Sequence, residues 1–227
     1  MAAAATTPVL TYAGPGNFIP MARFLMRQQE KFMQRLGDHN IPGLRWVIEG
    51  FNYYDKERVK EVGPDRAAAE WIVRCGGCVK FDKITDRFSD YNALVRRCAE
   101  LDPRLSDDQV RVTHIEAIDA SVTGYGCRHF DGLNAILDVR FVRCKNLHDF
   151  GLKYMGDAVG KKLNYLEIDS CPRITEDGLA HLKQCTGLKS LLIHNLPRVY
   201  GKPKIYQELR QALPMCEIHY PDYEKPS

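Results

Sequence analysis

The sequence lacks several features that would assign it to a common functional class. It has no run of about eighteen apolar residues, so no segment is expected to cross a membrane as a helix. Its formal net charge is only +3 over 227 residues, which gives no reason to expect nucleic acid as a partner. The motifs G-x-S-x-G, H-E-x-x-H and the P-loop are missing. We therefore expect a protein that is not an enzyme and does not bind nucleic acid.

The eight cysteines do not form a recognisable metal or disulfide framework. Cys75 and Cys78 make one C-x-x-C, but no second pair follows at the spacing of a zinc site, and no thioredoxin-like context surrounds it. We interpret the pair as two incidental thiols at a helix terminus. A redox-sensitive dithiol and a metal site are the alternatives. Free thiols indicate a reducing compartment.

What the sequence does contain is a strong pattern between Leu163 and Leu182, LNYLEIDSCPRITEDGLAHL. It matches one unit of a cysteine-containing leucine-rich repeat, in which a short strand is followed by a cysteine and by a helix that Thr175 can cap. Such a unit cannot bury its apolar face alone, so neighbouring units are required. The apolar anchors of this unit are Leu163, Leu166, Ile168, Cys171, Ile174, Leu179 and Leu182.

Neighbouring copies occur on both sides of this unit. Ile136 lies 27 residues before Leu163, and Leu188 lies 25 residues after it. Both intervals fall within the roughly 20–29 residues of leucine-rich repeats. A degenerate first strand is expected near Ile115 and a short last strand at 216–220. The remaining anchors are Ile118 in the first unit, Val139, Phe141, Cys144, Leu147 and Leu152 in the second, Leu191, Ile193, Leu196 and Val199 in the fourth, and Cys216, Ile218 and Tyr220 in the last strand.

The N-terminal stretch differs from the rest in composition. Residues 1–16 are uncharged and rich in Ala, Thr, Pro and Gly, which predicts disorder. Basic residues then recur every four positions along one face of an apolar-rich helix. This acid-poor amphipathic pattern predicts a mitochondrial presequence. An interfacial membrane helix and a solvated helix packed on the domain are the alternatives. The basic residues are Arg23, Arg27, Lys31 and Arg35.

Three parts follow from these patterns. Residues 1–38 form the presequence-like segment, and 39–78 form a small helical capping domain. Residues 79–227 form the repeat domain. Within the cap, a helix is expected to begin near Asp55, and a second to begin at Pro64, which tolerates the first helical position. Within the repeat domain we expect an irregular insertion at 82–111 with a short helix at 91–100, a helix at 206–213, and a frayed tail from Pro221. The predicted fold is an open α/β leucine-rich-repeat solenoid with a helical N-terminal cap.

Several segments, taken in order, resemble one family. They are YDKERVKEVGPDRAAAEWIVRCGG, VKF, DYNAL, IEAIDAS, CPRITEDGLAHL, LPRV and ALP, between about Asn52 and Ile218. This order is similar to mitochondrial factor B, also called ATP synthase subunit s or coupling factor B. The related complex I distal-membrane-arm assembly factor shares the GGxVKF, CPRI and LP segments but matches GPDRAAAEW poorly.

The resemblance implies a function and a bound ion. It implies a non-catalytic coupling factor, peripheral on the matrix side of the mitochondrial inner membrane, that associates with the membrane sector of ATP synthase and supports proton-driven ATP synthesis. It also implies a magnesium ion held by main-chain carbonyls, which match Gly76 and Ser121 here. The chain departs from the family at Val142, where family members often carry the first cysteine of a C-x-C pair. Only the second cysteine, Cys144, is present here, so dithiol chemistry of that pair is not expected.

The binding face is expected to be formed by strand residues between the apolar anchors, because these alternate outward. We predict that this strand face binds the partner, rather than the helix face. Two alternatives remain: an assembly factor for the membrane arm of complex I that binds its assembly intermediates, and a generic leucine-rich-repeat adaptor. The candidate contacts are Arg140, Arg143, Glu167, Asp169, Lys189 and His194.

Overall fold

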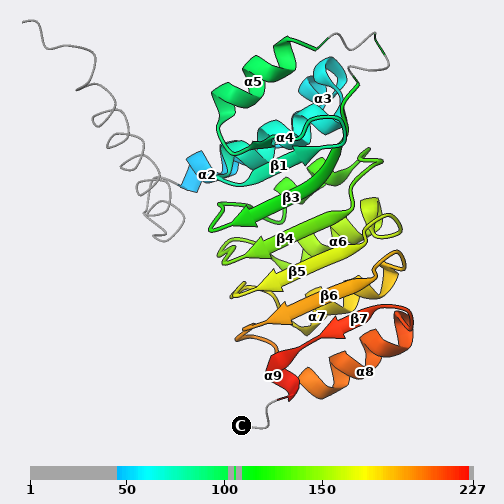
Figure 1. Cartoon of the computed structure of the whole chain (residues 1–227). Coiled ribbons are helices and arrows are strands. Elements are labelled where there is room, and N and C mark those ends of the chain that lie inside the picture. The colour runs from blue at the N-terminus through cyan, green and yellow to red at the C-terminus, as the bar shows by residue number, and fades with distance from the viewer. Residues whose placement is uncertain (1–44, 102–104, 106–108, 225–227) are drawn as a thin grey trace, which may run out of the picture.

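The structure is a computed structural model that describes residues 45–101, 105 and 109–224. The predicted presequence-like segment at 1–38 and the first residues of the predicted cap lie outside the described residues. Figure 1 shows the described part as one open sheet with helices stacked along it.

The sheet has seven strands in the order β2-β1-β3-β4-β5-β6-β7. Strands β3 to β7 are parallel and follow one another along the chain, whereas β1 pairs antiparallel with both β2 and β3. The two outermost strands, β2 and β7, are not paired with each other, so the sheet stays open. The strands are β1 (Cys78–Phe81), β2 (Arg87–Phe88), β3 (Val112–Ile118), β4 (Asp138–Val142), β5 (Tyr165–Asp169), β6 (Ser190–His194) and β7 (Glu217–His219).

Helical segments connect successive parallel strands. Helices α4, α6 and α7 lie behind the sheet in Figure 1, so that the opposite face of the sheet is turned toward the viewer. The helices are α2 (Arg45–Phe51), α3 (Lys56–Val62), α4 (Pro64–Arg74), α5 (Tyr91–Ala99), α6 (Asp149–Val159), α7 (Glu176–Ala180), α8 (Lys202–Ala212) and α9 (Pro221–Glu224), with 3-10 segments η2 (Gly126–Phe130) and η3 (His181–Gln184).

The core lies between the sheet and these helices. Val139, Leu166, Leu191 and Ile218 are register partners on four neighbouring strands, and each is buried. Alternation along a strand sends every second side chain to this layer, so the strands pack as one continuous apolar surface. The predicted anchors from Leu163 to Leu182 are all fully buried.

A residue with positive φ directly follows each of four parallel strands. The residue after β3, β4, β5 and β6 is Asp119, Arg143, Ser170 and Asn195, and its φ is +53°, +54°, +52° and +47° respectively. Non-glycine residues rarely adopt this left-handed conformation. Its recurrence at four equivalent places means that the chain leaves each strand in the same way.

Helix α4 covers the β1–β3 end of the sheet and is tied to α2 by one buried amide. Asn52 donates to the carbonyl of Ser121 (2.8 Å) and accepts from Trp71 Nε1 (3.1 Å) and from the amide of Thr123 (2.9 Å). Asn52 is buried, and all these contacts cross long stretches of chain. The single side chain therefore fixes α2 against α4 and against the loop after β3.

Most expected elements are confirmed and three need correction. Helix α3 has Asp55 as its N-cap, α5 lies at 91–99, and β7 is the short last strand. Helix α8 begins at Lys202 rather than 206, because Pro203 is tolerated in a first turn. The expected frayed tail was wrong for Pro221–Glu224, which is helix α9, and Tyr223 stacks on Tyr206. The stretch expected to be irregular also contains strand β2, which pairs with β1.

Among the described residues, no helix combines the length and the apolarity needed to cross a bilayer. The division between a cap and a repeat domain after residue 78 stays a prediction.

Candidate functional site

The candidate site is the face of the sheet opposite the helices, here called the strand face. Its side chains come from the positions that alternate with the core residues. In register they form two rows across β3 to β7, in which every side chain except Leu192 is polar or charged. The rows are His114, Asp138, Tyr165, Ser190 and Glu217, and then Glu116, Arg140, Glu167, Leu192 and His219.

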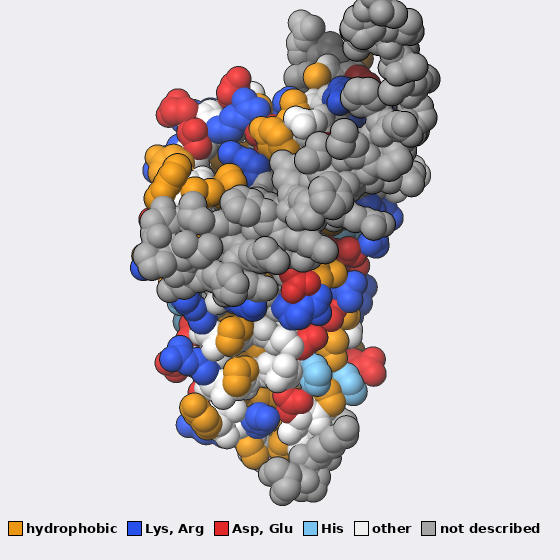
Figure 2. All heavy atoms as spheres, turned by 90° about the vertical axis from the view of Figure 1, so that its left-hand side faces the viewer, with side chains coloured by type: hydrophobic (Ala, Val, Ile, Leu, Met, Phe, Trp, Pro, Cys, Tyr) orange, Lys and Arg blue, Asp and Glu red, His pale blue; other side chains and the backbone are white. Residues whose placement is uncertain are grey.

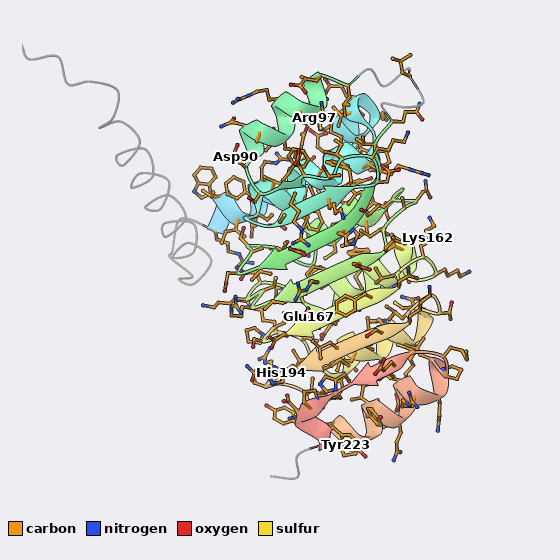
Figure 3. The ribbon with its side chains drawn as sticks, in the orientation of Figure 1. Asp90, Arg97, Lys162, Glu167, His194 and Tyr223 are labelled. Carbon is orange, nitrogen blue, oxygen red and sulfur yellow. The ribbon has the colours of Figure 1, made fainter. Side chains whose placement is uncertain are left out.

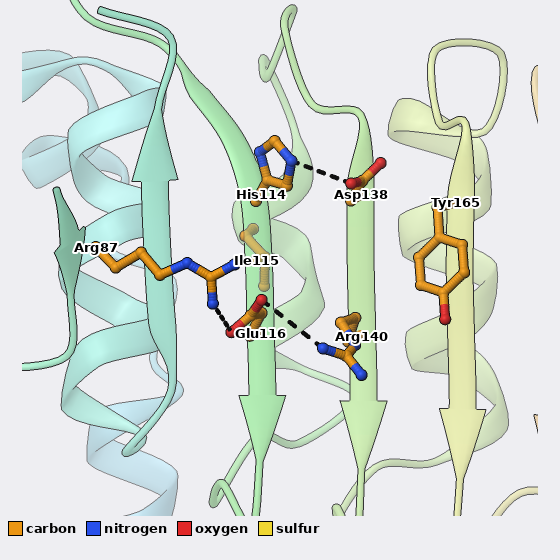
Figure 4. Close-up of a pocket in the computed structure, with 7 residues that line it drawn as sticks. All are labelled: Arg87, His114, Ile115, Glu116, Asp138, Arg140 and Tyr165. Carbon is orange, nitrogen blue, oxygen red and sulfur yellow. Dashed lines mark hydrogen bonds and ion pairs between the residues drawn. The ribbon is translucent and has the colours of Figure 1, made fainter. Parts of the chain in front are cut away.

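A cavity of about 380 Å³ opens on the strand face over β3, β4 and β5. Figure 4 shows its polar groups joined in pairs: Arg87 contacts Glu116 (2.9 Å), and His114 Nε2 lies 3.0 Å from Asp138. Arg140 lies 3.9 Å from Glu116. The cavity is therefore lined by a network of paired charges, which gives a polar and structured surface.

Glu167 was expected to be exposed, and this was wrong. Its side chain is buried, because Arg140 donates a hydrogen bond to its carboxylate at 2.5 Å and the hydroxyl of Tyr165 donates another at 3.1 Å. Figure 3 places Glu167 on β5 in the middle of the sheet. The hydrogen bond to Glu167 raises the pKa of Arg140. Arg140 and Glu167, both predicted contacts, therefore bind each other, and only the exposed part of the Arg140 side chain is accessible to a partner.

The other predicted contacts lie near the carboxyl ends of the strands. Arg143 is exposed and follows β4, where its guanidinium makes two hydrogen bonds to Asp119, at 2.7 and 2.6 Å. His194 ends β6 and lies between two carboxylates, with Nδ1 3.1 Å from Asp169 and Nε2 3.5 Å from Asp222. Figure 3 shows His194 at this end of its strand.

Lys189 lies at the opposite end of the strand, because it immediately precedes β6. Its side chain is exposed. The six predicted contacts therefore do not form one cluster: Arg140, Glu167, Asp169 and His194 lie within strands, whereas Arg143 follows β4 and Lys189 precedes β6. Figure 2 looks onto the side where the strands end, and there basic, acidic and histidine side chains are interspersed below the grey residues.

Cys75 and Cys78 flank the turn between α4 and β1. Cys75 is fully inside the core, and burial raises the pKa of its thiol to about 12. Cys78 is half-buried on the strand face, where burial and the nearby Glu116 raise its pKa as well. Reactive thiols need a lowered pKa. Neither thiol is activated, so the redox role stays an unsupported prediction.

Gly76 and Ser121, the predicted magnesium ligands, belong to adjacent segments. The amide of Ser121 donates to the carbonyl of Cys75 at 2.8 Å, which brings the two turns together. The carbonyl of Ser121 already accepts the Asn52 amide, and the described residues contain no cluster of three acidic, histidine or cysteine ligands. Two neutral carbonyls fit only an ion that keeps most of its water ligands.

The sequence did not single out five members of the charged network. They line the cavity but were not named as contacts: Arg87, His114, Glu116, Asp138 and Tyr165. For the last four, the signal was available, because each stands next to an apolar anchor on its strand. Arg87 could not be found in this way, since β2 lies within the stretch expected to be irregular.

The fold and the charged face define an open α/β domain of parallel strand–helix units with a polar sheet surface. No family model matches the chain. Individual proteins do match: it is 32% identical over 175 residues to "ATP synthase subunit s, mitochondrial" of Bos taurus and 33% identical to the Homo sapiens protein of that name. Each match spans 76% of this chain and 84% of the relative. The chain belongs to the ATP synthase subunit s family.

A more distant likeness links the chain to a second group. It is 28% identical over 163 residues to "Distal membrane arm assembly component 2" of Drosophila melanogaster, a match that covers 71% of this chain and 55% of that protein. The expected resemblance to factor B is thus confirmed, together with its weaker relation to the assembly component.

Proposed function

We propose that this protein is a non-catalytic mitochondrial accessory factor that docks on the membrane sector of ATP synthase and supports proton-coupled ATP synthesis. The observation that carries the proposal is the identity of about one third with the subunit s proteins over most of both chains. The proposed place is the matrix side of the inner membrane, with peripheral attachment.

The proposed architecture is a leucine-rich-repeat solenoid. Intervals of 27 and 25 residues separate the register partners Val139, Leu166 and Leu191, within the range of such repeats. Support also comes from the left-handed residue after each of four strands. Repeats of this kind present an extended face to other proteins, and this favours docking over chemistry.

The proposed docking surface is the strand face. The charged network of the cavity lies on this face over β3 to β5. Exposed charged groups stand at the strand ends: Arg143 after β4, His194 at the end of β6 and Lys189 just before β6. Charged groups arranged over a rigid sheet steer association and fix the register of a partner.

A hydrated magnesium ion at the Gly76 and Ser121 carbonyls is part of the proposal. Titration of the purified protein with magnesium, and separately with calcium, tests this part of the proposal by comparing the two binding affinities.

The test is complexome profiling of gently solubilised mitochondria that express tagged variants. The wild-type protein should co-migrate with ATP synthase. Lys189→Glu, combined with the exchange Arg143→Asp and Asp119→Arg, alters the strand face and keeps the ion pair, so it should reduce co-migration without unfolding the protein. Lys204→Glu, an exposed residue of α8, is the matched control for the helix side.

The second candidate is an assembly factor for the membrane arm of respiratory complex I. The 28% identity to the distal membrane arm component favours it. Migration of the wild-type protein with complex I intermediates, and not with ATP synthase, would establish this function and refute the first. Equal co-migration of the strand-face and control variants would refute the proposed docking surface.

A further inference from the structure

A second cavity lies where the parallel strands end, away from the charged network on the strand face. Its volume is about 550 Å³, within the usual range of small-ligand sites. Helix α2 forms one wall, and the loops after β3, β4 and β5 form the others. Carboxyl ends of parallel strands are the common position for ligand sites in open α/β sheets. The residues that matter here are Arg45, Tyr54, Tyr125, Arg128, His148 and Arg173.

The cavity concentrates positive charge. Three arginines line it against one glutamate, Glu49, which pairs with Arg45 at 2.8 Å. Arg128 and Arg173 form no ion pair with any residue in the described ranges. In a chain whose whole formal charge is +3, two unneutralised guanidinium groups in one cavity form a specific electrostatic feature.

Both of these arginines are held in place by uncharged partners. Arg173 donates to Nε2 of His148 at 3.0 Å, and the imidazole is stacked on Phe150 at 5.5 Å. Arg128 lies over the ring of Tyr54, with its guanidinium carbon 5.1 Å from the ring centroid. Groups that are fixed before a ligand arrives lose less entropy on binding.

The state of His148 agrees with this arrangement. Arg173 can only donate, so the Nε2 of His148 must accept, which requires a neutral imidazole. Burial lowers the pKa of His148, and the positive charges of Arg173 and Arg45 lower it further. The histidine therefore orients Arg173 without adding a competing charge.

We propose that this cavity binds a phosphate group. A carboxylate would neutralise one of the two unpaired arginines, whereas a phosphate monoester carries a charge of about −1.5 to −2 at neutral pH. The planar guanidinium also matches phosphate oxygens in pairs. The phosphate belongs either to a soluble nucleotide or to a phospholipid headgroup. This inference is independent of docking on ATP synthase.

Binding of pyrophosphate and of ADP to the purified chain, measured by isothermal titration calorimetry at low salt, tests the proposal. Saturable binding is expected. Arg128→Gln and Arg173→Gln should each weaken it about tenfold or more, because each removes charge-assisted hydrogen bonds. Arg97→Gln on α5 removes an equal charge from an exposed pair with Glu100 and should bind as wild type does.

A second pair of variants distinguishes loss of binding from loss of folding. Arg128→Lys and Arg173→Lys keep the charge but lose the paired geometry, so they should fold with a wild-type melting temperature and still bind more weakly. Co-sedimentation of the protein with phosphatidylcholine vesicles that contain phosphatidic acid tests whether the bound phosphate belongs to a phospholipid headgroup or to a soluble ligand. Competition of vesicle binding by pyrophosphate indicates a headgroup, and ADP binding without vesicle binding indicates a soluble ligand. Absence of binding to all three probes, or equal binding by all variants, would overturn the proposal.

Discussion

The guanidinium of Arg140 on β4 donates to the carboxylate of Glu167 on β5, 2.5 Å away across two neighbouring strands. Both side chains belong to the strand face, where the arginine is partly exposed and the glutamate is buried by its neighbours. Removing either residue affects stability as well as the surface. Charge reversal at Arg140 therefore cannot test partner binding by itself.

The first prediction concerns this pair. Arg140→Met should lower the free energy of unfolding by roughly 2–3 kcal/mol, because the buried carboxylate of Glu167 then keeps only the Tyr165 hydroxyl as a partner. Adding Glu167→Gln should recover part of the loss. Urea unfolding of the two single variants and the double variant measures the coupling. Arg97→Met breaks an exposed pair and should cost less than about 0.5 kcal/mol. Additive losses would show that the two side chains do not interact.

The second prediction concerns Glu70, a buried carboxylate of α4. It accepts hydrogen bonds from Arg58 at 2.8 and 3.1 Å and from Arg66 at 3.0 Å. Burial alone would raise its pKa, but these hydrogen bonds outweigh burial and lower it. Glu70→Gln leaves Arg66 without its charged partner and leaves Arg58 with only the exposed Glu61, so it should cost about 2–3 kcal/mol in urea unfolding. Glu57→Gln, from an exposed pair with Lys60, should be nearly neutral.

The third prediction is a pH dependence that arises from His129. This residue is buried and stacked on Trp71, and burial lowers its pKa to about 4. Between pH 6.5 and 4 the unfolded state binds a proton that the folded state does not, so stability falls as pH decreases through this window. The loss from this group is about 3 kcal/mol at pH 4.

The variant His129→Phe isolates this contribution. It keeps an aromatic ring against Trp71 and cannot be protonated. Its free energy of unfolding should therefore decline less steeply than that of the wild type between pH 6.5 and 4. Parallel profiles for the two proteins over this range would contradict the assignment to His129.

The fourth prediction concerns the thiols. At pH 7.5 Cys78 should react with iodoacetamide more slowly than free cysteine, because its pKa is raised, and Cys75 should not react in the folded protein. Mass spectrometry after timed labelling identifies each modified residue. Rapid modification of Cys75 would revive the redox-dithiol hypothesis. Labelling of both in urea is the positive control.

The residues of the core could be predicted from the sequence, but the exposure and contacts of many strand-face residues could not. Leu163, Leu166 and Ile168 were placed correctly, because apolar spacing of a strand directly reports which side chains are buried. Glu167 was misplaced because its burial depends on Tyr165 and Arg140, and Arg140 lies 27 positions away in the sequence. Alternation predicts the direction of a side chain but not what covers it.

The phosphate-binding proposal could not have come from the sequence for a related reason. Arg128 and Arg173 are separated by 45 positions and follow different strands. Both line the same cavity because the strands are parallel, which brings the loops that follow successive strands to one end of the sheet. A single arginine in a loop carries no comparable signal.

The short outer strands restrict how a partner can attach. Strand β2 has two residues and β7 has three, so each margin of the sheet offers few unpaired backbone groups. An incoming strand would gain few hydrogen bonds there, and short margins of this kind prevent copies of a chain from joining sheet to sheet. Recruitment by strand addition is therefore disfavoured. Under the proposed docking on the strand face, recognition depends on side chains, so substitutions on this face can change the partner without altering the backbone.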